Sequence, residues 1–245
     1  MEPLLSFTEV RVERHHHQVL LGCTAEVRRG VTVLMGPNGS GKSTLLHALT
    51  GQVRSSGSIT WSGAPLGRRG LDREQGRLVG YLPQEPSFPA DVTVGRALAY
   101  ACWLRPPPPG SPGPSDLLDL LGILDVRDER VGDLSVGTRR LALLAVAVAH
   151  RPRVLVLDEP TAGVDGAHRR RLRRFLRDGP QVAVLMASHL VDDVDLVADH
   201  VLVLAHGRLA FDGPPDELHR IGEAARSEDE STIEAALRCV GATAA

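Results

Sequence analysis

Short apolar runs alternate along the chain with segments whose apolar residues have helical spacing. The runs at 31–35 and 154–157 are apolar throughout except for Thr32, which is typical of parallel strands buried on both faces. Residues 42–50 and 139–150 have helical spacing. Further runs that we expect to be strands occupy 4–12, 57–61, 78–82, 182–186 and 201–204. Strands that alternate with helices predict a mostly parallel α/β core.

The stretch from Pro86 to about Val131 has a different character. Apolar residues at helical spacing are interrupted by prolines at 106–109, 112 and 114. We interpret this stretch as an inserted helical subdomain with a proline-rich loop. We therefore expect one domain over 1–245. Its α/β core would be 1–85 and 139–215, its helical subdomain 86–138, and its C-terminal tail 216–245, which the acidic run 228–230 suggests is loosely ordered.

Charge and cysteine content exclude several classes of protein. The net charge of −2 gives no reason to expect nucleic acid as a partner, and the three scattered cysteines do not form a disulfide framework or a zinc site. The arginines between 169 and 177 could form a nucleic-acid patch. Because Leu172, Phe175 and Leu176 share one face of that segment, a packed helix with a solvated charged face is favoured.

No membrane-spanning or secretory segment is expected. The most apolar stretch, 141–149, is well short of the roughly 18 residues that span a bilayer. The first twelve residues contain two glutamates and lack the pattern of a signal peptide. We expect a cytoplasmic protein.

Lysine and asparagine are almost absent from the chain. Lys42 is the only lysine among 28 basic residues, and Asn38 is the only asparagine. A compact ammonium suits a position between phosphate oxygens, where a planar guanidinium does not fit. The two single copies therefore indicate a phosphate site, although biased composition alone could also produce this pattern.

The surrounding residues match the phosphate-binding motif G-x-x-x-x-G-K-[ST], between a predicted strand and a predicted helix. Glycines let backbone N–H groups converge on phosphate, and the positive end of the helix adds to the attraction. We expect Lys42 to reach the β- and γ-phosphates of ATP and the Ser43 hydroxyl to bind Mg²⁺. The motif consists of Gly36, Pro37, Asn38, Gly39, Ser40, Gly41, Lys42, Ser43 and Thr44.

Two adjacent carboxylates follow the buried strand at 154–157. Ligands bind at the carboxyl ends of parallel strands, and neighbouring residues there point in different directions. We expect Asp158 to hold Mg²⁺ and Glu159 to polarise the attacking water or accept its proton. An Asp-Glu pair after a strand is more often a solvated loop, but the phosphate motif makes the catalytic interpretation preferable.

The order of these motifs over roughly residues 4–215 resembles that of ATP-binding cassette proteins. Gln84 looks like the family's Q-loop glutamine, which contacts Mg²⁺ and the water. The segment 134–138, Leu-Ser-Val-Gly-Thr, stands where the family signature is expected, so Ser135 and Gly137 would face the γ-phosphate of ATP held by a second subunit. Asp165 resembles the D-loop aspartate, and His189 resembles the switch histidine that senses the γ-phosphate.

The sequence departs from the family pattern at two places. No aromatic residue precedes the phosphate loop to stack on adenine, so Arg14 or His15 could stack instead, or the adenine could be loosely held. The signature has Val136 in place of a glycine and Thr138 in place of a glutamine. Val136 is tolerable if its φ is negative and costly if it needs a glycine conformation.

The resemblance implies a P-loop NTPase core, which is a mostly parallel sheet with flanking helices and an antiparallel β subdomain, and an inserted helical subdomain. It implies an ATPase that uses ATP and Mg²⁺, acts as a homodimer, and powers an exporter through a separate membrane permease at the inner face of the cell membrane. Two alternatives stay open: a regulatory cassette protein with little hydrolysis, and a soluble cassette ATPase without a transport role.

Overall fold

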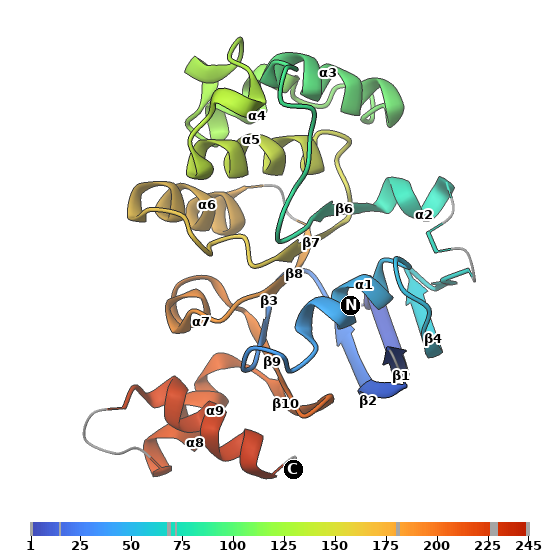
Figure 1. Ribbon diagram of the computed structural model, residues 1–245, viewed down its shortest axis with the longest axis vertical. Coiled ribbons are helices and arrows are strands. Elements are labelled where there is room, and N and C mark those ends of the chain that lie inside the picture. The colour runs from blue at the N-terminus through green and yellow to red at the C-terminus, as the bar shows by residue number, and fades with distance from the viewer. Residues whose placement is uncertain are drawn as a thin grey trace.

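The computed structural model describes residues 2–14, 16–67, 70–71, 73–179, 182–225 and 230–243. Its centre is a sheet of six strands in the order β10-β9-β3-β8-β7-β6, which are parallel except for β10, antiparallel to β9 (Figure 1). This confirms the mostly parallel core. The strands are β3 (Gly30–Met35), β6 (Val79–Leu82), β7 (Val154–Asp158), β8 (Ala183–Ala187), β9 (His200–Ala205) and β10 (Arg208–Gly213).

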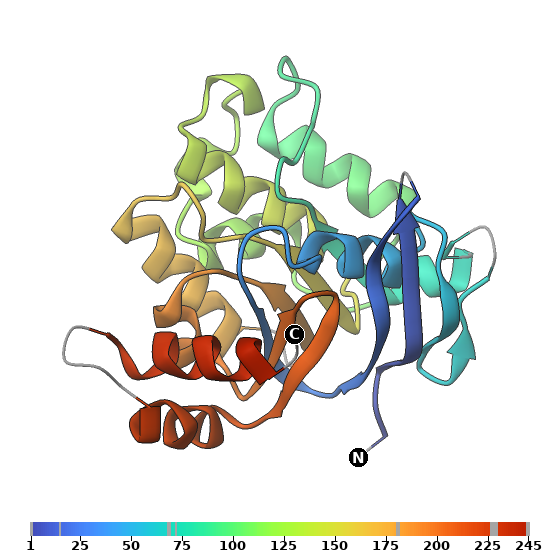
Figure 2. The same ribbon diagram turned by 60° about the horizontal axis from the view of Figure 1, so that its bottom comes forward.

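A second sheet, antiparallel and in the order β2-β1-β4-β5, lies beside the first, as the family resemblance implies (Figure 2). Helix α1 (Lys42–Leu49) packs between the two sheets. The antiparallel strands are β1 (Leu5–Arg14), β2 (His17–Val27), β4 (Ser56–Trp61) and β5 (Ala64–Pro65).

The central strands are buried on both faces, and alternate side chains enter two different cores. Leu155 and Leu157 of β7 pack in the core that includes the helical subdomain. Val154 and Val156 pack in the core shared with α1 and the antiparallel sheet. Every residue of β7 is buried, which explains why the strand has an uninterrupted apolar sequence.

The segment 86–138, interpreted as the helical subdomain, contains α3 (Val94–Leu104), α4 (Pro114–Leu120) and 3-10 turns at Leu124–Val126 and Val131–Asp133. Helix α5 (Val136–Val148) runs across the expected boundary at 138. The proline-rich stretch lies between α3 and α4, and α4 begins at Pro114, where the missing N–H has no cost. Helix α5 starts three residues earlier than the apolar spacing indicates, because the Ser135 hydroxyl caps it by accepting from the N–H of Thr138. Short helix α2 (Arg73–Leu78) precedes β6.

The C-terminal part contains packed helices, so the expectation of a loosely ordered tail is wrong for its described residues. Helices α8 (Pro215–Ala225) and α9 (Thr232–Thr243) cover β9 and β10 (Figure 2). Ile233, Ala235 and Ala236 of α9 are buried, so small side chains allow close packing here. Residues 228 and 229 lie outside the described residues. The remaining helices are α6 (Gly166–Asp178) and α7 (Val191–Val197).

Candidate functional site

The phosphate loop connects the end of β3 to the start of α1. Gly36 has a φ of 146°, and a Cβ there would lie 2.1 Å from the carbonyl oxygen of Leu204, so only glycine fits. Gly41, with a φ of 105°, is the N-cap of α1. Lys42 folds back over the loop, and its Nζ donates to the carbonyls of Gly36 at 2.8 Å and Pro37 at 3.2 Å. The ammonium is therefore directed into the loop that would hold phosphate.

The surroundings of Lys42 shift the pKa of its ammonium group. Burial lowers the pKa of its ammonium, and the nearby carboxylates of Glu159 and Asp158 oppose that shift. A phosphate bound in the loop would add negative charge close to the ammonium. The site therefore favours an anionic ligand, which would raise the pKa of Lys42 again.

Ser43 and Asp158 form a direct pair across the site. The hydroxyl Oγ of Ser43 donates to Oδ1 of Asp158 at 3.1 Å, although the two residues are 115 positions apart. Asp158 ends β7 and is 2% exposed. A hydroxyl and a carboxylate are hard oxygen ligands of the kind that Mg²⁺ prefers, so this pair fits the ion that accompanies ATP. Gln84 is exposed beyond the end of β6.

Glu159 follows Asp158 at the same sheet edge. It has a φ of 50°, in the left-handed region that favours glycine, and is 6% exposed. His189 follows β8, the neighbour of β7, and its ring Nδ1 lies 2.5 Å from Oε2 of Glu159. The adjacent strands thus bring together two residues that the sequence singled out separately.

A buried network holds the segment before His189. The carboxylate of Asp193, which is fully buried, accepts from the hydroxyls of Thr161 and Ser188, each at 2.6 Å. The guanidinium of Arg173 donates to the same carboxylate at 2.7 and 2.9 Å. This network fixes Ser188, next to His189, against the loop that follows Glu159.

Arg140, which was not predicted from the sequence as a functional residue, connects α5 to the sheet edge where Asp158 and Glu159 lie. Its guanidinium is buried and donates to three backbone carbonyls, those of Gln84 at 2.7 Å, Asp158 at 3.0 Å and Glu159 at 2.5 Å. Burial lowers its pKa. Arg140 shares a helix face with the buried Leu144 and Val148, and a charge on an apolar face is the signal that could have revealed it.

The signature residues lie at the start of α5, and Ser135 and Val136 are exposed there. The φ of Val136 is not positive, so the backbone does not require a glycine at this position. Gly137 is buried against His168 of α6, and a Cβ there would lie 2.8 Å from Cγ of that ring. A glycine is therefore needed at 137 but not at 136.

Asp165 caps α6 close to the signature. Its Oδ1 accepts from the N–H groups of Ala167 and His168, and its Oδ2 lies 2.7 Å from Nδ1 of His168. The hydrogen bonds from the backbone and ring of His168 lower the pKa of Asp165. Within the described residues, no hydrogen bond joins Ser135 or Asp165 to the phosphate loop, so the predicted site residues form two separate groups.

The proposed adenine-contacting residues are at the turn between β1 and β2. Arg14 is exposed and pairs with His17 in the strand register. His15 lies outside the described residues. Strand β2 passes the phosphate loop, because a Cβ at Gly41 would touch Leu20 at 3.0 Å. The hairpin is therefore attached next to the loop, although no contact of Arg14 identifies a base site.

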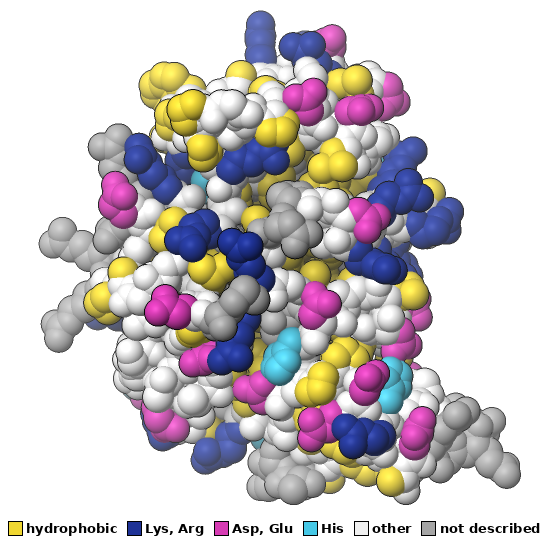
Figure 3. Space-filling model, turned by 180° about the vertical axis from the view of Figure 1, so that it is seen from behind, with side chains coloured by type: hydrophobic (Ala, Val, Ile, Leu, Met, Phe, Trp, Pro, Cys, Tyr) yellow, Lys and Arg dark blue, Asp and Glu magenta, His cyan; other side chains and the backbone are white. Residues whose placement is uncertain are grey.

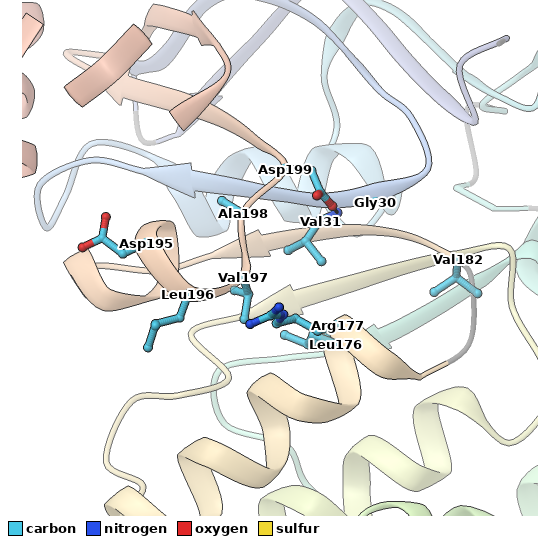
Figure 4. Close-up of a pocket in the computed structure, with 10 residues that line it drawn as sticks. All are labelled: Gly30, Val31, Leu176, Arg177, Val182, Asp195, Leu196, Val197, Ala198 and Asp199. Carbon is cyan, nitrogen blue, oxygen red and sulfur yellow. Dashed lines mark hydrogen bonds between the residues drawn. The ribbon is translucent and has the colours of Figure 1, made fainter. Parts of the chain in front are cut away.

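A hollow of about 450 Å³ lies at the opposite, amino-terminal edge of the parallel sheet (Figure 4). It is bounded by the starts of β3 and β8, the end of α6 and the segment 195–199. The Asp199 carboxylate accepts from the N–H of Val31 at 2.8 Å, so its main polar group already has a structural partner. None of the predicted site residues lines this hollow, and ligands of parallel α/β sheets bind at the other edge.

None of the helices within the described residues reaches the length and hydrophobicity that a membrane span needs. The same part of the chain contains no cluster of three or more His, Cys, Asp or Glu side chains that could hold a metal ion.

Comparison with known proteins gives consistent matches. The family model described as ABC transporter matches residues 22–162. The chain is 31% identical to the uncharacterized ABC transporter ATP-binding protein YxlF of Bacillus subtilis, over 88% of this chain and 72% of that protein. It is 34% identical to the zinc import ATP-binding protein ZnuC of Halorhodospira halophila, over 87% of this chain and 78% of that protein.

The match to the molybdenum import ATP-binding protein ModC of Rhodospirillum rubrum, at 30% identity, covers 86% of this chain and only 59% of that protein. Among solved structures, the ADP conformation of an ATP-binding cassette of an ABC transporter superposes with a TM-score of 0.76. That match covers 89% of this chain and 93% of the solved one, at 22% identity. The structural likeness supports the fold alone.

Proposed function

The chain belongs to the ABC transporter family as an ATP-binding subunit with ATPase activity, and from this premise we propose that it powers export through a separate permease. The proposed catalytic site rests on one observation, which is that four residues lie together at one edge of the central sheet. Lys42 and Ser43 from the phosphate loop lie with Asp158 and Glu159 at the end of β7. Export, as the direction of transport, is a prediction from the sequence alone. The relatives include subunits named for import.

Each side chain has a proposed role in hydrolysis. Lys42 and the loop N–H groups would bind the phosphates, and Ser43, Asp158 and Gln84 would hold Mg²⁺. When bound there, Mg²⁺ would supply positive charge that offsets the charge of the phosphates. Glu159 orients the attacking water and accepts its proton, and His189 contacts the γ-phosphate after it leaves Glu159.

The exposed signature suggests how a complete site is assembled. Ser135 is exposed and Gly137 and Asp165 lie beside it, on a part of the molecule separate from the phosphate loop. We propose that a second copy brings this surface to the ATP, so that each subunit completes the other's site with two-fold symmetry. Hydrolysis would then reopen the dimer.

A surface for the permease is proposed on the helical subdomain, which would place the protein at the inner face of the membrane. Six of the seven large hydrophobic side chains that are exposed within the described residues belong to this subdomain. Figure 3 shows hydrophobic side chains on the surface at that end of the molecule. Tyr100 and Trp103 of α3 are 55% and 74% exposed, with ring centroids 6.0 Å apart. Large exposed aromatic patches are typical of protein interfaces.

The decisive experiment combines Glu159→Gln, which should retain ATP, with Ser135→Arg. Size exclusion with and without Mg-ATP should show a dimer for Glu159→Gln and a monomer that still binds ATP for the double variant. Ser55→Arg, at an exposed position in the loop before β4, is the matched control and should leave the dimer intact. If Glu159→Gln stays monomeric but dimerises with a second cassette protein, the homodimer is wrong and the partner is a different subunit.

A further inference from the structure

A chain of hydrogen-bonded side chains joins the start of α5 to the start of α6. Ser135 Oγ lies 2.9 Å from Thr138 Oγ1, which lies 3.1 Å from Nε2 of His168. The other ring nitrogen, Nδ1, lies 2.7 Å from Oδ2 of Asp165. We call these four residues the signature relay. The proposed hydrolysis uses Ser135 at one end and leaves Thr138 and His168 without a role.

The direction of the hydrogen bonds is set at the Asp165 end. A carboxylate only accepts, so Nδ1 of His168 carries a proton. In a neutral ring Nε2 is then an acceptor, and Thr138 must donate its single hydroxyl proton to it. Thr138 can then only accept from Ser135. In this state the Ser135 proton points towards Thr138, and its oxygen, which also accepts from the N–H of Thr138, has one lone pair left to face outward.

Protonation of the ring reverses the chain. Both nitrogens of an imidazolium donate, so Thr138 accepts from Nε2–H and turns its own proton towards Ser135. The Ser135 hydroxyl proton is then free to point outward. An anion facing Ser135 would meet a lone pair in the first state and a hydrogen-bond donor in the second.

The groups around the His168 ring are compatible with the two states described above, the neutral ring and the protonated ring. Asp165, from the loop before α6, is the one acidic side chain within 4.0 Å of the His168 ring in the part of the chain that the structure describes. Helix α5 faces the ring with Thr138 and with the backbone of Gly137. Hydrogen bonds from His168 lower the pKa of Asp165, which keeps that carboxylate an anionic acceptor.

We propose that Thr138 and His168 are positioning residues, which determine whether the Ser135 hydroxyl can donate to the γ-phosphate of ATP held by a second subunit. The inference rests on the proposed two-subunit site. Phosphate oxygens only accept, so the neutral ring weakens the contact across the dimer, and the protonated ring adds a charge-assisted hydrogen bond. Acidic conditions therefore favour ATP-driven dimerisation through residues outside the phosphate loop.

The first test compares Thr138→Ser with Thr138→Val in the Glu159→Gln background. The serine keeps the relay hydroxyl and the valine removes it with little change of shape. Dimerisation with Mg-ATP should strengthen about tenfold as the pH is lowered, in the parent and in Thr138→Ser. Thr138→Val should lose this dependence. Because His189 is present in all three proteins, its titration cannot produce a difference between them.

The second test does not depend on assembly. Nitrogen NMR of the ¹⁵N-histidine-labelled full chain should show neutral His168 with its proton on Nδ1, and Thr138→Val should change the Nε2 signal. A proton on Nε2, or an unchanged pH dependence in Thr138→Val, would overturn the relay. If Ser135→Arg still dimerises, the two-subunit function itself fails. If Ser135→Arg abolishes dimerisation while Thr138→Val behaves like the parent, only the relay fails.

Discussion

Nδ1 of His189 lies 2.5 Å from Oε2 of Glu159, so the two residues proposed for water activation and phosphate sensing are hydrogen-bonded to each other. Glu159 is buried, with 8% of its side chain exposed, whereas 46% of the His189 side chain is exposed. Of the two side chains, that of His189 therefore has the room to rotate away from the other. A bound γ-phosphate would compete for the histidine and release the carboxylate for water.

Replacing Glu159 with Gln should lower the ATPase rate by at least about 100-fold, because the amide cannot accept a proton from water. The amide oxygen can still accept from His189, so nucleotide affinity should change much less. Steady-state hydrolysis and equilibrium binding of ATP measure the two effects. Glu223→Gln, at an exposed position of α8, is the control. Near wild-type turnover in Glu159→Gln would assign the water-activating role elsewhere.

Bound Mg-ATP should protect Lys42 from an amine-reactive reagent. Because Lys42 is the only lysine, the modified ε-amine is unambiguous in mass spectrometry, with the N-terminal amine as an internal control. Its Nζ already contacts the carbonyls of Gly36 and Pro37, so labelling without nucleotide should be slow but measurable. Equal labelling rates with and without saturating Mg-ATP would contradict the assignment of the phosphate loop.

Arg140→Gln should destabilise the fold and impair hydrolysis together. The variant leaves up to three carbonyls without their donor, two of them buried and that of Gln84 partly buried, which should lower the free energy of unfolding by about 3 kcal/mol. Because those carbonyls belong to Gln84, Asp158 and Glu159, the turnover of the folded variant should also fall. Urea denaturation and steady-state kinetics measure the two effects. Arg174→Gln, at an exposed position of α6, should change neither quantity.

Features that depend on local sequence were predictable. The strand-loop-helix at residues 31–50 and the buried strand ending at Asp158 were expected from contiguous motifs, and the structure contains both. The resemblance predicted separate roles for Glu159 and His189 but not their contact, because the contact depends on β7 and β8 being neighbouring strands.

Features that depend on distant partners were missed. Strand β2 was not predicted, although buried and exposed positions alternate over 23–27, because its first half lacks that alternation and its place is set by pairing with β1. Helix α9 was not predicted, although its core-packed residues Ile233, Ala236, Leu237 and Val240 have helical spacing, and its position depends on contacts with β9 and β10. Arg140 contacts carbonyls 18, 19 and 56 positions away, which no local pattern encodes.

Acidification should destabilise the protein through His150. Burial and the nearby Arg105 lower its pKa to about 4, partly offset by its hydrogen bond to the Val79 carbonyl. Since the unfolded chain binds the proton more readily, this group's contribution is complete above about pH 6.5 and is lost as the pH falls to 4.

The expected loss from His150 is about 3 kcal/mol between pH 7 and pH 4. Urea denaturation across that range measures it. His150→Gln can keep a hydrogen bond to Val79 and cannot titrate, so its stability should fall less steeply. His206→Gln, on the exposed turn between β9 and β10, should keep the wild-type slope. Identical slopes for His150→Gln and the wild type would show that groups other than His150 determine how stability depends on pH.

Val136 should slow hydrolysis through its side chain rather than its backbone. It is 62% exposed next to Ser135, and its φ is not positive, so the valine is not strained where it stands. Its branched side chain would lie where the signature meets ATP on a second subunit. Val136→Ala removes the branch and favours the helix, whereas Val136→Gly restores the family residue but should cost α5 about 1 kcal/mol relative to alanine.

Both variants should therefore hydrolyse ATP faster than the wild type, by a few-fold, and only Val136→Gly should lose stability. Steady-state kinetics and urea denaturation separate the two effects, and Leu196→Ala, at an exposed position of α7, is the control for removing an exposed apolar side chain. If Val136→Gly alone accelerated hydrolysis, the signature would need a glycine conformation in the closed dimer. If neither variant did, the side chain at 136 would not lie at the shared site, and the altered signature would not limit turnover.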